Sequence, residues 1–206
     1  GLLTAKQISS LSKFSPSESY SIFKACEQNR WHIIDFDSSF YPALLRDLPD
    51  FPAVLFADGD YKVLKSAVPI AFVGTRKASE YSKKIAYKLS FSVAGSGAVI
   101  VSGGALGIDS ASHENALAAN GKTVAVLGNG LGFDYLHQNE DLRRRISNQG
   151  VVISEFMPFT EASRTTFPIR NRIISGMSLG TVVIEAGEKS GSLITASLAA
   201  AQGRDV

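Results

Sequence analysis

From residue 68 onward, short apolar runs alternate with stretches that have the hydrophobic period of a helix. Each apolar run is continuous, whereas a strand with one exposed face would alternate between apolar and polar residues. Buried strands that are each followed by a helix indicate a mainly parallel sheet with helices on both faces, and right-handed crossovers make this a doubly wound α/β fold. The predicted strands are residues 69–73, 98–101, 123–127, 151–153 and 181–184, and the predicted helices are residues 80–94, 109–119, 139–147, 169–177 and 193–202.

The first 65 residues have a different character. They hold many of the aromatic residues and a large share of the prolines. Ser15 followed by Pro16 predicts the start of a short helix, because serine can cap an unpaired amide and proline suits the first turn. Later prolines predict short extended pieces. We interpret residues 1–65 as an N-terminal lid or packing segment, and residues 66–206 as the main domain.

Charge and cysteine content narrow the class of protein. The formal net charge is only +2, so any affinity for nucleic acid has to come from a local cluster of cations. The single cysteine, Cys26, excludes an internal disulfide, which fits a reducing cytoplasm. Neither a signal peptide nor an apolar stretch long enough to span a bilayer is evident. We therefore expect a cytoplasmic protein without a membrane partner.

Small residues recur directly after the predicted strands. In a doubly wound sheet these loops share the edge at which ligands bind. Glycine allows a close approach of the backbone, and amides at helix N-termini favour anions, so this edge suits phosphate. The alternative is that the glycines only turn the chain from strand to helix. The candidate binding residues in these loops are Gly74, Thr75, Arg76, Gly103, Gly104, Ser190, Gly191 and Ser192.

The segment of residues 164–172 carries the strongest chemical signal. It holds three arginines and one phenylalanine, and it lacks acidic residues. Arginine offers forked donors to phosphate, and phenylalanine offers a face on which a base can stack. The candidate nucleic-acid-binding residues of this segment are Arg164, Phe167, Arg170 and Asn171.

A structural alternative exists for the same segment. Its arginines, Arg172 above all, can pair with Glu155 or Glu185 while Phe167 fills the core. A second run of three arginines, residues 143–145, follows acidic residues and is expected on a solvated helix face.

Familiar cofactor and catalytic motifs are missing from the sequence. Three glycines within residues 128–132 follow a predicted strand, but their spacing does not match a dinucleotide-binding loop. Neither the lysine of a phosphate-binding loop nor the serine elbow of a hydrolase is present. Asp109 and His113 lack further metal ligands nearby, so a first-turn acid and a buried, hydrogen-bonded histidine are the preferred interpretation. We expect no cofactor, no metal and no catalytic residue.

Several separate motifs carry a family resemblance. They are Phe-Val-Gly-Thr-Arg at residues 72–76, Val-Ser-Gly-Gly-Ala-Leu-Gly-Ile-Asp at 101–109 with His113, Ala-Val-Leu-Gly at 125–128, Phe-Pro-Ile-Arg-Asn-Arg-Ile-Ile at 167–174, and Glu-Ala at 185–186 with Ser-Gly-Ser-Leu-Ile-Thr-Ala at 190–196. Together they resemble the DprA (Smf) family of DNA-processing proteins over about residues 41–206. The Arg-Asn-Arg and Ser-Gly-Ser-Leu-Ile-Thr elements are the most specific.

The resemblance implies an extended Rossmann-like fold and binding of single-stranded DNA without marked sequence preference. It also implies a homodimer that protects the DNA and helps to load the RecA recombinase during natural transformation. Arg76, Arg164, Phe167 and the neighbouring glycine loops would form the DNA pocket. The chain departs from the family at Leu136, where proline is usual. It also stops at Val206, where the family continues along a further strand, so we expect residues 66–206 to be a truncated DNA-binding domain.

Two other classes of protein are possible. Nucleotide phosphoribohydrolases of the LOG type have a related fold and use a glutamate in a Pro-Gly-Gly-x-Gly-Thr-x-x-Glu motif. The corresponding loop here, residues 189–197, contains no carboxylate, so no general acid or base is evident. A nucleotide-sensing domain is the second alternative. Affinity that rises with oligonucleotide length would distinguish DNA binding from nucleotide sensing.

Overall fold

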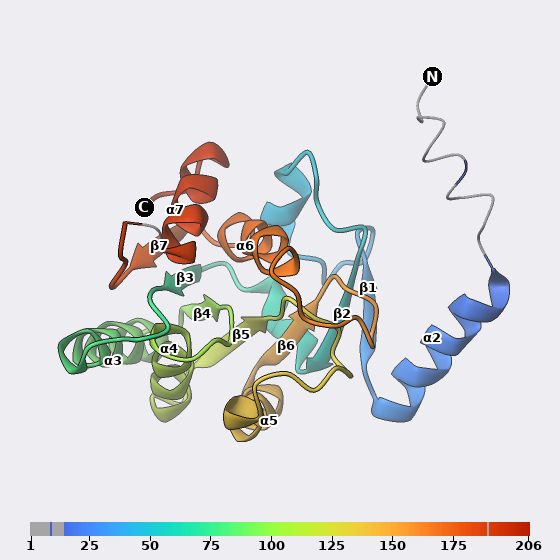
Figure 1. The fold of residues 1–206 in the computed structure, drawn as a ribbon, viewed down its shortest axis with the longest axis horizontal. Coiled ribbons are helices and arrows are strands. Elements are labelled where there is room, and N and C mark those ends of the chain that lie inside the picture. The colour runs from blue at the N-terminus through green and yellow to red at the C-terminus, as the bar shows by residue number, and fades with distance from the viewer. Residues whose placement is uncertain (1–8, 10–14, 189) are drawn as a thin grey trace.

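The computed structural model describes residue 9, residues 15–188 and residues 190–206. Residues 1–8 and 10–14 of the predicted N-terminal segment, and Lys189 of the loop compared with LOG enzymes, lie outside the described residues. One sheet (Figure 1) contains seven strands, β1 (His32–Asp35), β2 (Val54–Gly59), β3 (Pro69–Val73), β4 (Val99–Ser102), β5 (Lys122–Val126), β6 (Val151–Ser154) and β7 (Gly180–Val183). The α-helices are α2 (Pro16–Asn29), α3 (Glu80–Gly95), α4 (Ile108–Ala118), α5 (Glu140–Gln149), α6 (Thr166–Gly176) and α7 (Gly191–Ala201), and the short 3-10 helices are η1 (Ala43–Asp47), η2 (Tyr61–Lys65) and η3 (His137–Asn139).

The sheet has the strand order β1-β2-β6-β5-β4-β3-β7. The five strands from β6 to β7 in this order are parallel, and a helix follows each of them along the chain. The predicted doubly wound α/β fold is therefore confirmed. None of the helices in the described part of the chain combines the length and the apolar character that a membrane span needs.

Two predicted helices begin two or three residues earlier in the structure than the sequence indicates. Helix α6 begins at Thr166 instead of residue 169, because Pro168 fits within a first turn, where its missing amide costs no hydrogen bond. Helix α7 begins at Gly191 instead of residue 193, because the Ser190 hydroxyl accepts a hydrogen bond from the Ser192 amide at 3.2 Å. Both helices therefore reach the carboxyl edge of the sheet.

The N-terminal segment extends the sheet. Strands β1 and β2 form an antiparallel pair, and β2 continues the sheet antiparallel to β6, with Ala57 opposite Ile153. Helix α2 begins at Pro16, as predicted, and extends away from the sheet beyond β1 (Figure 1). The segment is thus partly an edge of the sheet, and the division of the chain at residue 65 stays a prediction.

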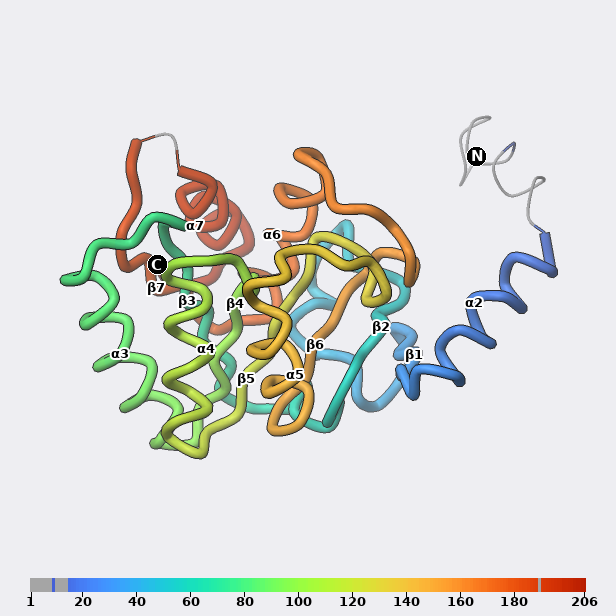
Figure 2. Tube along the Cα trace, turned by 60° about the horizontal axis from the view of Figure 1, so that its bottom comes forward, coloured from blue at the N-terminus to red at the C-terminus, as the bar shows by residue number. Residues whose placement is uncertain are grey.

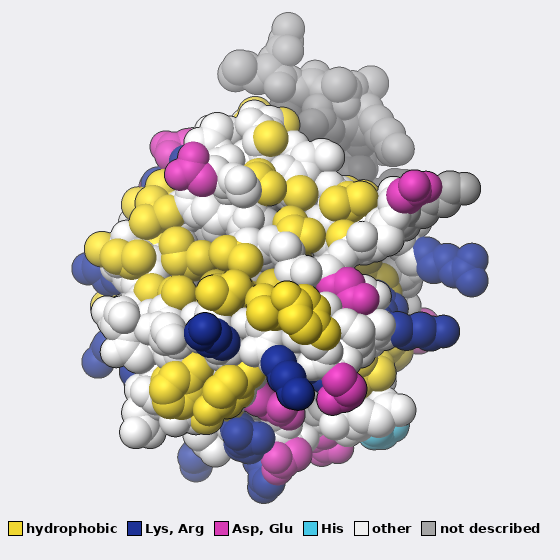
Figure 3. Space-filling view, turned by 90° about the vertical axis from the view of Figure 1, so that its left-hand side faces the viewer, with side chains coloured by type: hydrophobic (Ala, Val, Ile, Leu, Met, Phe, Trp, Pro, Cys, Tyr) yellow, Lys and Arg dark blue, Asp and Glu magenta, His cyan; other side chains and the backbone are white. Residues whose placement is uncertain are grey.

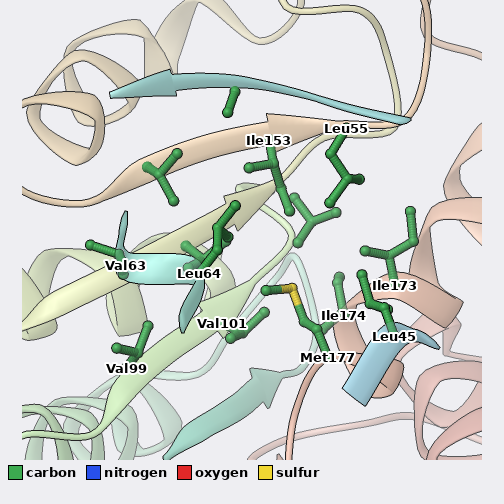
Figure 4. Close-up of a cluster of buried hydrophobic side chains, with 14 of the residues drawn as sticks. Leu45, Leu55, Val63, Leu64, Val99, Val101, Ile153, Ile173, Ile174 and Met177 are labelled. Atoms are coloured by element: carbon green, nitrogen blue, oxygen red, sulfur yellow. The ribbon is translucent and has the colours of Figure 1, made fainter. Parts of the chain in front are cut away.

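Each face of the sheet has its own apolar layer, because successive strand residues point to opposite faces. Val99 and Val101 face a layer that includes η1, η2 and α6, whereas Ile100 faces α3 and α4. Leu45 of η1 and Ile173 of α6 are fully buried in the first layer (Figure 4). Burying such a side chain stabilises the fold by about 1.5–3 kcal/mol. The two layers hold the helices on both sides of the sheet.

A switch in strand order creates a crevice at the carboxyl edge. The chain leaves β3 toward β4, β5 and β6 on one side, and returns to place β7 on the other side of β3. The connections that leave β3 and β7 therefore diverge to opposite faces of the sheet. The loops that follow these strands, together with the starts of α6 and α7, lie at one end of the molecule (Figure 2). Doubly wound proteins bind ligands at such a position.

Candidate nucleic-acid interface

A cavity with a volume of about 850 Å³ opens at the carboxyl ends of β3 and β7. The structure brings all but two of the predicted binding residues to its walls. The exceptions, Gly103 and Gly104, line a small adjoining cavity, which shares Arg76 and Phe167 with the larger one. Which of these residues contact nucleic acid stays a prediction. The predicted residues that line the larger cavity are Gly74, Thr75, Arg76, Arg164, Phe167, Arg170, Asn171, Ser190, Gly191 and Ser192.

The loop after β3 is held tightly against its neighbours. The Thr75 amide donates to the Glu185 carbonyl at 2.7 Å, and the Ile108 amide donates to the Thr75 carbonyl at 3.2 Å. A Cβ atom on Gly74 would lie only 2.5 Å from the Ile108 side chain, so glycine is required for this approach. The fixed loop places the exposed side chain of Arg76 at the cavity.

Phe167 contacts a cation and a second aromatic ring. The Arg76 guanidinium carbon is 5.2 Å from the centroid of the Phe167 ring, within the range of a cation–π interaction. On the β5 side, the Tyr135 ring centroid is 5.5 Å away. Phe167 is half-buried and does not belong to the apolar core layers, so it does not fill the core as the structural alternative supposed.

Tyr135 is a candidate that the sequence did not single out. It lines the large cavity and the small one, and it contacts Phe167. Arg143 was expected on a solvated helix face, but it lines the small cavity. Its Nη1 atom donates a hydrogen bond to the Leu136 carbonyl at 3.1 Å, which holds the side chain against the loop that carries Tyr135. The available signal was the position of Tyr135 in the loop that follows β5, at the same edge of the sheet.

Two helices begin at the cavity wall. Arg164 lies two residues before the start of α6, and Ser190 caps α7. The Asn171 side chain connects the two helices through a 3.5 Å hydrogen bond to the Gly191 carbonyl. Helix N-termini carry partial positive charge, and in the described residues neither Arg76 nor Arg164 forms an ion pair. This side of the cavity therefore favours an anion.

Arg170 occupies a different position from the exposed arginines. Its guanidinium is buried, and Nη1 donates to the carbonyls of Gly103, at 2.7 Å, and Val126. A Cβ atom on Gly103 would lie 2.2 Å from this nitrogen. Burial lowers the pKa of Arg170 to about 10, so the guanidinium stays charged at neutral pH. It fastens the ends of β4 and β5 beneath the cavity, and a direct contact with nucleic acid stays a prediction.

Arg172 has the structural role that the alternative interpretation gave it. Its Nη2 atom forms an ion pair with Glu155, and its Nε atom lies 3.3 Å from a carboxylate oxygen of Asp50. The side chain is largely buried in this arrangement. Arg172 therefore ties α6 to the loops beside it and is turned away from the cavity lining.

Asp109 and His113 form structural contacts. Asp109 lies in the first turn of α4 and accepts a hydrogen bond from the Ala105 amide at 3.3 Å. His113 is fully buried, with Nδ1 2.7 Å from the Thr123 hydroxyl, and burial lowers its pKa to about 3. Across the described part of the chain, no cluster of three or more potential metal ligands occurs. The interpretation of this pair as a first-turn acid and a buried histidine is confirmed.

Comparisons with known proteins agree on one family. A family model described as DNA recombination-mediator protein A matches residues 32–206. DNA processing protein DprA of Bacillus subtilis (strain 168) is 40% identical over 185 residues, which are 90% of this chain and 62% of that protein. The chain thus spans less than two thirds of the length of this relative.

Two solved structures extend the similarity to the fold. DNA processing protein A from Streptococcus pneumoniae has a TM-score of 0.86 and 36% identity, covering 94% of this chain and 66% of that chain. DNA processing protein A from Helicobacter pylori, whose structure is described in terms of its single-stranded DNA binding mode, has a TM-score of 0.78 and 32% identity. That match covers 85% of this chain and 78% of the other.

Proposed function

We propose that this chain, which belongs to the DNA recombination-mediator protein A (DprA/Smf) family, binds single-stranded DNA in the cavity at the carboxyl ends of β3 and β7. The family resemblance found in the sequence is confirmed by the family model and by the two solved structures. The proposal adds that the strand is bound without marked sequence preference.

The observation that supports this proposal most strongly is the cluster of Arg76, Phe167 and Tyr135 beside two helix N-termini, in which the arginine lies over the Phe167 ring and the Tyr135 ring contacts it at a tilt. Arg76 and Arg164 would contact phosphates, together with the start of α7. A base would stack on the aromatic pair. Every base has a stacking face, so such a contact tolerates any sequence, but it requires a base that is unpaired. The arrangement therefore favours a single strand over a duplex.

The later roles in the proposal rest on family membership. We propose that the protein protects the bound strand and helps to load the RecA recombinase during natural transformation, as a homodimer in the cytoplasm. The chain spans 62% of its Bacillus subtilis relative, so these are proposals for the whole protein.

We further propose that the chain has no catalytic site of its own. Of the residues described at the large cavity, Asp109 is the only one with a carboxylate. This carboxylate is buried and accepts a hydrogen bond from the Ala105 amide. A general base for nucleotide hydrolysis would have to reach the substrate. Incubation of the purified protein with nucleoside monophosphates tests this proposal. If the protein releases free base and a mutation at the cavity abolishes the release, the LOG-type alternative is favoured.

A titration of fluorescently labelled oligo-dT tests the main proposal. We expect affinity to fall with salt, with a slope of about 0.7 in log–log terms for each phosphate contact. Matched duplex and mononucleotide controls should bind more weakly. Equal affinity for the duplex, or binding insensitive to salt, would contradict the proposal. Equal affinity for a mononucleotide would support a nucleotide sensor.

A further inference from the structure

Helix α3 presents two contrasting faces. The buried face is a stripe of small residues, Ser82, Ala86, Ser90 and Ala94, spaced four apart. Small side chains allow close packing, and α4 lies against α3 on this inner side (Figure 1). The opposite face is therefore the one available to a partner.

The outer face of α3 carries large aromatic side chains. Tyr81 is 74% exposed, Tyr87 is 51% exposed and Phe91 is 37% exposed. The rings of Tyr87 and Phe91 are stacked, with centroids 5.6 Å apart and an interplanar angle of 27°. Lys84 and Lys88 are interleaved with them, at spacings of three and four residues that place all five on one side of the helix.

The charge of this surface is positive. The only acid on α3, Glu80, forms an ion pair with Lys83 at 2.7 Å. In the part of the chain that the structure describes, Lys84 and Lys88 form no ion pair, although Lys84 lies near enough to Glu80 to help lower the pKa of that carboxyl. Figure 3 looks onto the side of the molecule that carries α3, where hydrophobic side chains form a broad band with Lys and Arg side chains beside it.

The surface begins next to the cavity. Helix α3 starts shortly after Arg76 in the chain, and its cap residue Ser79 is fastened to the end of β7, since the Ser79 amide donates to the Glu185 carboxylate at 2.9 Å. The start of α3 thus shares the carboxyl edge with Arg76, and the helix leads away from that edge (Figure 2).

We propose that the outer face of α3, formed by Tyr81, Lys84, Tyr87, Lys88 and Phe91, is a second contact surface for single-stranded nucleic acid. It receives the strand where it leaves the cavity past Arg76. Lysines neutralise phosphates and the aromatic rings stack with bases, as on other surfaces that bind single strands. Lysine is depleted in protein–protein interfaces, so the pairing of lysines with aromatics favours a nucleic acid over a protein partner. This inference rests on the proposed function of the cavity.

Oligonucleotide length separates the two surfaces. An oligo-dT of about six nucleotides should be held by the cavity alone, whereas one of about 25 nucleotides should also reach α3. We expect the double variant Tyr87→Ala/Phe91→Ala to lose at least about fivefold in affinity for the long strand, and to bind the short strand as the unmodified protein does. The variant Lys84→Ala/Lys88→Ala should also lower the salt slope for the long strand alone.

The matched control is Tyr20→Ala/Lys24→Ala, which removes an exposed tyrosine and lysine from α2. This control should leave both affinities unchanged, and thermal melting establishes that all variants are folded. If the α3 variants bind the long strand normally, or change only self-association in sedimentation, the α3 surface does not bind the strand and the cavity proposal stands. If the unmodified protein binds neither strand, the proposed function itself is wrong.

Discussion

Arg76 lies over the ring of Phe167; Arg76 comes from the loop after β3, and Phe167 comes from the first turn of α6, the helix that follows β6. The cation–π contact places the guanidinium over the ring, and no carboxylate of the described residues forms an ion pair with it. A phosphate placed beside the ring would meet a cation that is already oriented. The two side chains can nevertheless be separated experimentally, because one contact depends on charge and the other on stacking.

Replacing Arg76 by alanine should weaken binding to every DNA sequence alike. The loss of one phosphate contact should lower the salt slope by about 0.7, and we expect the same for Arg164→Ala. Arg76→Lys should recover affinity only partly, since lysine cannot form a forked pair of hydrogen bonds. Arg145→Ala, which removes an exposed arginine from α5, is the matched control and should change neither quantity. An unchanged slope in the Arg76 variant would exclude a phosphate contact there.

Truncating Phe167 should weaken binding by about 1–3 kcal/mol without changing the salt slope, because a stacked base is lost and no charge is removed. Phe167 is only half-buried, so its effect on thermal melting should be much smaller than that of Phe72→Ala. Phe72 is 1% exposed in the core, and its truncation should lower the free energy of unfolding by about 3–5 kcal/mol. Reduced melting of Phe167→Ala with normal affinity per folded molecule would show that the ring is structural.

Arg170→Met should affect folding before it affects binding. Arg170 also interacts electrostatically with the buried Asp109 carboxyl, so the substitution leaves that carboxyl and the carbonyls of Gly103 and Val126 without a nearby cation, which should cost about 3–5 kcal/mol in the free energy of unfolding. Chemical denaturation measures this loss. Arg144→Met provides the control, since its ion pair with Asp141 is exposed and should contribute at most about 1 kcal/mol. Similar denaturation midpoints for the two variants would mean that Arg170 does not fasten the strand ends.

His113 should make the protein less stable in mild acid. Its pKa is 6.5 in the unfolded chain and about 3 in the folded protein, because burial disfavours the charged ring. Between these two pKa values the unfolded state binds more protons than the folded state. The contribution of His113 to stability is therefore fully present above about pH 6.5 and is lost as the pH falls toward 3. Each pH unit in this window should remove up to about 1.4 kcal/mol.

The control for this pH dependence is His113→Gln, whose free energy of unfolding should vary less steeply between pH 6.5 and pH 4. Burial raises the pKa of Asp109, so this group changes the pH dependence in the opposite direction. Comparing the unmodified protein with His113→Gln removes the contribution of Asp109 from the difference between their slopes of unfolding free energy against pH. Identical slopes would show that His113 is not the group responsible.

The sheet could be predicted because its signal is local. An uninterrupted apolar run such as residues 98–101 has no exposed face to tolerate polar residues, so its type and approximate bounds are visible in the sequence. The hairpin of β1 and β2 was not predicted, since its residues have no clear alternation and their pairing with β6 depends on a contact almost 100 residues away (Ala57 opposite Ile153).

The cavity lining was predicted for a topological reason, because loops after parallel strands share an edge. The sequence could not separate Arg170, which is buried against backbone carbonyls, from Arg164, which is exposed. Arg170 lies inside α6 and its side chain points under the strand ends, whereas Arg164 lies in the loop before that helix. Tyr135 was missed because its loop, unlike residues 164–172, carries no arginine or lysine and has the acidic Asp134 next to the aromatic ring.

Strand β7 comes late in the sequence but pairs with β3, which comes much earlier, and this has a consequence for biosynthesis. A ribosome delivers β3, β4, β5 and β6 before it delivers β7, and until then one edge of β3 has no partner. Val183 pairs with Val73, and the start of α7 then closes the cavity wall. Such a distant contact forms late, because the intervening chain must first be ordered. The cavity proposed to bind DNA is therefore complete only after β7 has joined the sheet.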